Sequence, residues 1–196
     1  MIAYLEGKLV VREPTHLIMD VNGIGYEVKI SLQTFSAVKD LERAKVFTHF
    51  HVKEDSQTLF GFFEPSEKKR FLDLLSINGV GPSTALMILS SLSAEELQNA
   101  IAREDVGTIQ GVKGIGAKTA QRIVLELKDK MKKEGLLDKI SVSSPIFDNS
   151  LKAEALSALT TLGISKPAAE KSITSILKEE GDIKLEELIK LALRRA

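Results

Sequence analysis

Two short glycine hairpins carry the first chemistry that this sequence suggests. They are Gly79-Val80-Gly81 and Gly114-Ile115-Gly116, and they lie 35 residues apart. Glycine at both ends allows a tight turn and a close approach of the backbone to a ligand. Each hairpin is followed directly by a run typical of a helix start, where unpaired N–H groups and the helix dipole attract anions. We therefore predict that both hairpins bind phosphate through backbone amides.

Side chains beside the hairpins fit the same chemistry. Pro82 suits the first position of a helix, and Val80 and Ile115 can pin the flanking helices together. The two copies form a helix-hairpin-helix pattern, which holds a nucleic-acid backbone without reading bases. The alternative is a pair of plain turns between packed helices. The predicted DNA-phosphate contacts are Gly79, Val80, Gly81, Ser83, Thr84, Gly114, Ile115, Gly116, Lys118, Thr119 and Arg122.

Two other glycine-containing segments resemble functional loops less closely. Gly23-Ile24-Gly25 lies between alternating strand-like runs, so we interpret it as a β-hairpin. The run from Gly111 to Thr119 approaches a nucleotide-binding P-loop, but Ala117 stands where the lysine would have to follow Gly116. The run is also entered from helical sequence, whereas a P-loop follows a strand. We expect no nucleotide site and no cofactor.

Candidate metal ligands are few. Glu54 and Asp55 are adjacent carboxylates that could hold Mg²⁺, but a two-metal site needs more ligands, and the simpler interpretation is a solvated turn between two strands. His49 and His51 share one strand face and could begin a zinc site, yet no third ligand is near in sequence. A structural role is expected for both histidines, and no metal site is predicted.

The composition is that of a globular protein of 196 residues with 43% apolar content. No run is long enough to span a membrane, and no signal-peptide start is seen, so a cytoplasmic protein is expected. The absence of cysteine excludes disulfides and thiolate chemistry. The formal net charge is zero, but residues 109–133 hold seven Lys/Arg against two Asp/Glu. That local excess makes the second hairpin and its helix a basic stripe.

Periodicity divides the chain into four segments and predicts an α+β multidomain protein. Residues 1–64 alternate like five short strands, which favours a small barrel of the OB type. Residues 65–134 have helical periodicity and contain both hairpins. Residues 135–150 are rich in Ser, Pro, Asp and Asn and are interpreted as a flexible linker. Residues 151–196 predict three short helices, interrupted at Gly163 and Gly181.

These motifs together resemble a known family. The residues that carry the resemblance are Met1-Ile2, Val21 to Val28, Phe47 to Phe50, Glu54-Asp55, Leu59 to Phe62, Asn78 to Pro82, and Gly114-Ile115-Gly116 with Lys118-Thr119-Ala120. In this order they are similar to the RuvA family of bacterial Holliday-junction recognition subunits. The resemblance runs through all four segments. It departs at Ser83 and Ala117, where many members carry a basic residue, which weakens the expected phosphate affinity at those positions.

The resemblance implies a non-catalytic subunit that binds four-way junction DNA as a homotetramer, with one or two tetramers on the DNA. Its partner would be a RuvB-type hexameric ATPase that drives branch migration in recombination and repair, with a RuvC-type resolvase as a further partner. Glu54 and Asp55 would form an electrostatic acidic pin at the junction centre. The terminal segment would be a UBA-like three-helix bundle that docks the motor, with Leu162, Ile164, Leu188 and Leu191 as candidate contacts.

Two alternatives come from other functional classes. A structure-selective nuclease or repair glycosylase would use the hairpins for DNA and Glu54-Asp55 for catalysis. However, no further acidic cluster lies near that pair, and no lysine–aspartate pair follows a hairpin as in glycosylases. A ligase fragment with barrel and hairpins would need an adenylation lysine motif, which the sequence lacks. A nicking assay with Mg²⁺ or Mn²⁺ on a four-way junction separates the nuclease from the junction-binding scaffold.

Overall fold

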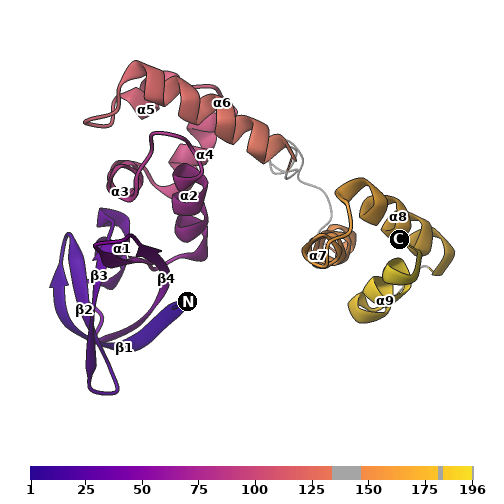
Figure 1. Ribbon diagram of the computed structural model, residues 1–196, viewed down its shortest axis with the longest axis horizontal. Helices are drawn as coiled ribbons and strands as arrows, with labels where there is room; N and C mark the ends of the chain where they lie inside the picture. Colours follow the sequence, from indigo (N-terminus) through magenta and orange to yellow (C-terminus); the bar gives the residue numbers. More distant parts are fainter. Residues whose placement is uncertain (134–146, 181–182, 196) are drawn as a thin grey trace. The chain divides into compact units, whose positions relative to one another are not determined.

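A computed structural model describes residues 1–133, 147–180 and 183–195 of the chain (Figure 1). The described residues fall into two compact units, the first ending before residues 134–146 and the second starting after them. Most of the predicted linker, 135–150, lies outside the described residues. Its last four residues are helical, because helix α7 already begins at Phe147. No helix in the described parts is both long and apolar enough to cross a membrane.

The first unit begins with a closed five-stranded barrel of the OB type. Its strands are β1 (Tyr4–Glu13), β2 (His16–Val21), β3 (Ile24–Ile30), β4 (Arg43–Val52) and β5 (Gln57–Phe62), in the order β1-β2-β3-β5-β4. Antiparallel pairs β1–β2, β2–β3, β1–β4 and β4–β5 and the parallel pair β3–β5 close the ring. Alternate residues of these strands point inward and form the barrel core, so the predicted period-2 pattern is confirmed.

Helix α1 (Leu32–Val38), between β3 and β4, was not predicted from the sequence. Ser31 caps it, because its hydroxyl accepts the Thr34 N–H at 3.0 Å. The hydroxyls of Thr34 and Ser31 both donate to the buried carboxylate of Glu67. The bond from Thr34 Oγ1 is 2.7 Å long, and the bond from Ser31 Oγ is shorter. Thr34 Oγ1 also accepts the Phe63 N–H at 3.0 Å. This network joins the barrel to the first helix of the helical region.

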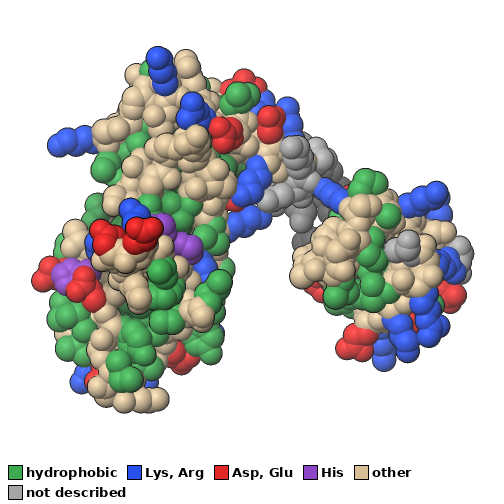
Figure 2. Space-filling model, in the orientation of Figure 1, with side chains coloured by type: hydrophobic (Ala, Val, Ile, Leu, Met, Phe, Trp, Pro, Cys, Tyr) green, Lys and Arg blue, Asp and Glu red, His purple; other side chains and the backbone are tan. Residues whose placement is uncertain are grey.

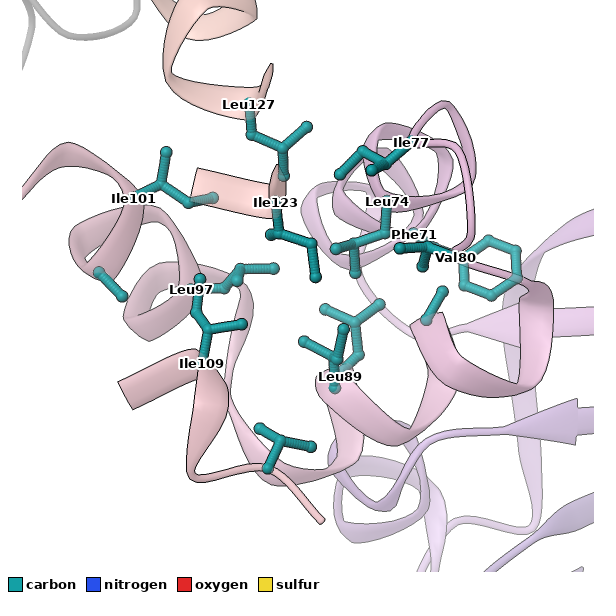
Figure 3. Close-up of a cluster of buried hydrophobic side chains, with 14 of the residues drawn as sticks. Phe71, Leu74, Ile77, Val80, Leu89, Leu97, Ile101, Ile109, Ile123 and Leu127 are labelled. Carbon is teal, nitrogen blue, oxygen red and sulfur yellow. The ribbon is translucent and has the colours of Figure 1, made fainter. Parts of the chain in front are cut away.

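The helical region comprises α2 (Pro65–Leu75), α3 (Pro82–Ser91), α4 (Ala94–Ala102), α5 (Val106–Gln110) and α6 (Ala117–Lys133). Buried side chains from all five helices meet in one core, part of which is drawn in Figure 3. Phe60 and Phe62 of β5 belong to this core, and the Phe62 and Phe71 rings lie 4.8 Å apart between centroids. The barrel and the helical region therefore share apolar packing as well as the Glu67 network.

A buried carboxylate on α2, the first helix of the helical region, forms an ion pair with α6, the last helix. The side chain of Asp73 on α2 is only 6% exposed and accepts Arg70 Nη1 at 2.7 Å. Lys130 Nζ of α6 lies 2.7 Å from the other oxygen of the same carboxylate. A buried charge is tolerated when it is paired in this way, and the pairing holds α2 against α6.

The second unit is a bundle of α7 (Phe147–Thr161), α8 (Lys166–Glu180) and α9 (Leu185–Arg195). It confirms the three predicted helices and has its own apolar core, which includes Ala155, Leu159, Ile173 and Leu188. Helix α7 is terminated by the turn at Gly163, whose φ of +94° suits glycine. The N–H of Gly163 donates to Thr160 O and that of Ile164 to Leu159 O, at 3.1 and 3.0 Å, which is a Schellman end.

Candidate nucleic-acid interface

The two hairpins are built by the same backbone hydrogen bonds, displaced by 35 residues. In the first, Ser76, Ile77, Val80 and Ala85 donate to the carbonyls of Leu72, Leu74, Ile77 and Gly81. In the second, Gly111, Val112, Ile115 and Ala120 donate to the carbonyls of Gly107, Ile109, Val112 and Gly116. The repeat predicted from glycine spacing is therefore a repeat of conformation.

The conformation of each hairpin needs glycine at its first position and an apolar residue at its second. Gly79 and Gly114 have φ of +91° and +86°, in the left-handed region that favours glycine. Val80 and Ile115 are 5% and 6% exposed, and both pack into the shared helical core. They anchor the hairpins from inside, so we assign them a supporting role through their side chains.

The second glycine of each hairpin has no comparable role in the fold. A Cβ added at Gly81 or Gly116 would meet no atom within 4 Å, and Gly81 has an ordinary φ of −87°. Gly81 is the N-cap of α3, and no side chain caps that helix. The N–H groups of Ser83 and Thr84 precede the first helical bond, Ala85 N–H to Gly81 O, and so remain available. The start of α6 repeats this geometry at Lys118 and Thr119.

The polar side chains predicted to contact phosphate lie beside these amides. Ser83 and Lys118 are exposed, and Thr84 and Thr119 are half-buried. Arg122, on α6, is half-exposed, and its Nη1 donates to the Asn78 carbonyl of the first hairpin at 2.9 Å. Its Nε lies 4.0 Å from a Glu126 carboxylate oxygen. Figure 2 shows Lys and Arg side chains standing out on the helical region around α5 and α6.

Sequence reasoning left three residues of this surface out of the predicted contacts. Asn78 and Lys113 are exposed at the tips of the two hairpins, and Met87 of α3 is 44% exposed. The Met87 sulfur would lie 3.8 Å from a Cβ built on Gly114. Superposing the sequence on itself with the 35-residue shift would have found all three, because it aligns Asn78 with Lys113 and Met87 with Arg122.

The predicted acidic pair occupies the tip of the β4–β5 hairpin. Glu54 and Asp55 are exposed, and Lys53 N–H donates to Ser56 O at 2.8 Å across the turn. The turn belongs to the same compact unit as both glycine hairpins. Its two carboxylates are therefore presented to solvent by a short, strand-supported loop.

His49 and His51 lie on β4 against the helical core. The His49 ring lies 5.7 Å from Phe71 and 6.0 Å from His51, between centroids. Burial, with His51 and Lys68 nearby, lowers the pKa of His49 below its usual value. Among the residues that the structure describes, no three His, Asp or Glu side chains are grouped to hold a metal ion. His49 contacts Phe71 and His51 contacts Phe60, and both contacts agree with the structural role expected for these histidines.

The four motor-docking candidates of the terminal bundle differ in their exposure to solvent. Leu188 is fully buried in the bundle core and thus offers no docking surface. Leu162 is 61% exposed, directly before the Gly163 turn. Ile164 and Leu191 are partly buried and pack against the core. Of the four, Leu162 is the most available to a partner.

Comparisons with known proteins cover nearly the whole chain. Residues 1–61 match the model of the RuvA N terminal domain, residues 71–129 that of the SAM-like helix-hairpin-helix tandem, and residues 150–196 that of the RuvA C-terminal domain. The relatives include proteins named Holliday junction branch migration complex subunit RuvA, among them the following three. The protein from Cytophaga hutchinsonii is 56% identical, covering 99% of each chain. Those from Christiangramia forsetii and Bacteroides fragilis are 51% and 41% identical, covering all of both chains. The chain belongs to the RuvA family.

Proposed function

We propose that this chain binds four-way DNA junctions without reading base sequence and is the recognition subunit of a branch-migration complex. The observation that carries the proposal is the repeated hairpin, which builds two helix N-termini of the same geometry on one helical core. Duplex DNA offers phosphates in regular rows, and contacts of this kind position a protein on DNA without sequence information. The names of the full-length relatives agree with this function.

Each hairpin would hold a backbone phosphate by the same means. The N–H groups at the starts of α3 and α6 donate to the phosphate oxygens, and the helix dipole adds attraction for the negative charge. Lys118 and Arg122 add side-chain charge, which makes part of the binding depend on salt. Because Gly81 and Gly116 carry no side chain, the backbone can come close enough for these bonds.

The acidic pair would supply selectivity for the junction. Glu54 and Asp55 are exposed at the β4–β5 turn, and carboxylates close to phosphates raise the free energy of binding a continuous duplex. At a crossover the strands diverge and leave space around the acids, so the repulsion is smaller. In this role the carboxylates act through charge and take no part in bond cleavage.

The remaining parts of the proposal concern assembly. Four copies would surround the junction in the cytoplasm, as one or two tetramers. The terminal bundle would recruit a RuvB-type hexameric ATPase, and a RuvC-type resolvase would act on the same junction. The separate core of the bundle supports this division, because a unit that folds around its own core can bind a partner independently of the DNA-binding unit.

A gel shift tests the central proposal. The purified full chain should bind a four-way junction more tightly than a duplex of equal length, in an excess of unrelated competitor DNA. A nicking assay on the same junction with Mg²⁺ or Mn²⁺ should show no cleavage. Equal affinity for both DNA forms would contradict junction recognition, and metal-dependent cleavage would identify a nuclease instead.

A further inference from the structure

The two hairpins have the same backbone but unequal charge. At three exposed aligned positions, the first copy has Asn78, Ser83 and Met87 and the second has Lys113, Lys118 and Arg122. The second copy therefore holds three cations where the first holds none. If each hairpin used only the side chains of its own motif, the first would bind phosphate without a cation at these positions.

The last of these aligned pairs is Met87 and Arg122. Each of these two side chains lies beside the hairpin of the other motif. Arg122 belongs by sequence to the second motif, yet its Nη1 donates to the Asn78 carbonyl of the first hairpin at 2.9 Å. The same atom would lie 3.9 Å from a Cβ built on Gly79. Met87, the counterpart of Arg122 in the first motif, reaches Gly114 of the second hairpin instead, with its sulfur 3.8 Å from the corresponding position.

The chemistry of Arg122 suits a double role at the first hairpin. A guanidinium has five N–H donors in a planar arrangement, and the bond to Asn78 uses Nη1. Glu126 lies 4.0 Å from Nε, which is longer than a hydrogen bond, and Nη2 makes no hydrogen bond within the described residues. Nη2 thus remains for an anion at a hairpin whose backbone the same side chain holds in place.

We propose that Arg122 positions the first hairpin and supplies its cation, although it is encoded in the second motif. The first hairpin then holds phosphate through its amides and a borrowed guanidinium, and the second through its amides with Lys113 and Lys118. Met87 gives the second hairpin an apolar neighbour in place of a charge. This division of roles rests on the proposed DNA binding, but the positioning of the hairpin by Arg122 does not.

A hydrogen-exchange experiment without DNA tests the positioning role. In the full chain, Arg122→Met should make amides of peptides within 76–86 exchange about tenfold faster, which corresponds to about 1.4 kcal/mol of local opening. Peptides within 111–121 should change less. Lys118→Met is the matched control, because it removes one cation from the same helix and should leave 76–86 unchanged. Unchanged exchange in 76–86 for Arg122→Met would overturn the positioning role.

A charge-swapped variant tests the binding role. The double variant Met87→Arg with Arg122→Met keeps the net charge and moves the cation to the other hairpin. When a four-way junction binds, peptides within 76–86 should lose most of their DNA-dependent protection in this variant, while those within 111–121 should keep or increase it. Arg122→Lys should retain the salt dependence of binding but not the slow exchange of 76–86, because an ammonium lacks the planar fork.

The possible outcomes distinguish the inference from the proposed function. If the parent protein shows no protection by junction DNA at either hairpin, the proposed function is wrong, and the exchange experiment without DNA still tests the contact. If the parent is protected and the charge-swapped variant matches it at both hairpins, the assignment of Arg122 to the first hairpin is wrong. Loss of DNA-dependent protection of peptides within 111–121 in Arg122→Met would also overturn this assignment.

Discussion

Gly81 and Gly116 are positions at which the proposed DNA binding can be tested separately from the stability of the fold. Neither would bring a Cβ within 4 Å of another atom, and each carbonyl accepts the first bond of the following helix. Gly79 and Gly114 are different, because their positive φ penalises any side chain. Substitutions at the two kinds of position should therefore separate DNA binding from stability.

We expect Gly81→Ser and Gly116→Ser to leave the free energy of unfolding unchanged or slightly raised, because serine is a favoured N-cap. Each should weaken junction binding at least tenfold, or about 1.4 kcal/mol, because the new hydroxyl occupies the amides and holds the backbone away from phosphate. Gly79→Val and Gly114→Val should weaken binding as much and also destabilise the fold by about 1–2 kcal/mol. Thermal unfolding and gel shifts measure both effects. Normal binding by both serine variants would refute the amide contacts.

The acidic pair makes a second prediction at this scale. Glu54→Lys with Asp55→Lys changes the local charge by four units in each subunit, so affinity should rise, and rise more for linear duplex than for a junction. The effect should persist near physiological salt, where the Debye length is about 8 Å, because the proposed function brings phosphates close to the turn. Competition gel shifts with both DNA forms give the selectivity ratio.

An adjacent acidic pair in the second unit provides the matched control. Glu186→Lys with Glu187→Lys makes the same change in net charge at the exposed start of α9. If that variant gains as much duplex affinity as the Glu54 and Asp55 variant, total charge explains the effect. If duplex binding does not rise in the latter while junction binding is normal, repulsion is not the source of selectivity.

At the scale of elements, the Glu67 network connects α1 to α2. Burial raises the pKa of Glu67, against the opposing effect of the hydroxyl bonds from Ser31 and Thr34, and nearby Glu64 raises it further. The folded chain therefore binds this proton more readily than the unfolded chain, whose carboxyl titrates near 4.5. The stability gained from this difference is fully present below the unfolded pKa and is lost as the pH rises through the folded pKa.

The resulting prediction is a pH-dependent difference between the parent and Glu67→Gln. Because glutamine does not titrate, the stability of the parent relative to the variant should be greatest at low pH and decrease as the pH rises above 4.5. Urea unfolding followed by tyrosine fluorescence is suitable, because both tyrosines, Tyr4 and Tyr26, lie in the barrel. A difference that stays constant with pH, or grows as pH rises, would contradict the raised pKa.

At the scale of the whole molecule, two units with separate cores predict separable functions. Removing residues 145–196 should leave junction binding within about twofold, since the hairpins and the acidic pair remain in the first unit. The truncated protein should not stimulate the ATPase of the motor partner. ATPase assays with a RuvB-type hexamer and junction DNA measure this. Full stimulation by the truncated protein would assign the bundle another role.

A point substitution refines the same test without removing the bundle. Leu162→Asp changes a side chain that is 61% exposed, so the bundle should stay folded while motor stimulation falls. Leu188→Asp should instead unfold the bundle, because Leu188 is fully buried. Circular dichroism distinguishes the two results. Normal motor stimulation by a folded Leu162→Asp variant would exclude this end of α7 from the docking surface.

Local sequence features predicted much of this structure. The strands of the barrel follow from alternation, and the hairpins follow from glycine pairs with helix-starting residues after them, because both signals act between near neighbours in the chain. The same kind of local feature predicted the interruption of the terminal helices at Gly163. Helix α1 was missed because only seven residues form it, and tertiary bonds from Thr34 to Glu67 stabilise it.

The sequence by itself determined that two hairpins of equivalent backbone conformation exist, since that conformation depends on glycine and on the spacing of a few apolar residues. Only the tertiary structure decided which side chains lie beside which hairpin. Arg122 reaches the first hairpin and Met87 the second, because the two motifs pack against each other around one core. Likewise, only packing distinguished buried Leu188 from exposed Leu162. Contacts between residues far apart in the chain depend on how the helices assemble, and short-range sequence patterns carry little information about that.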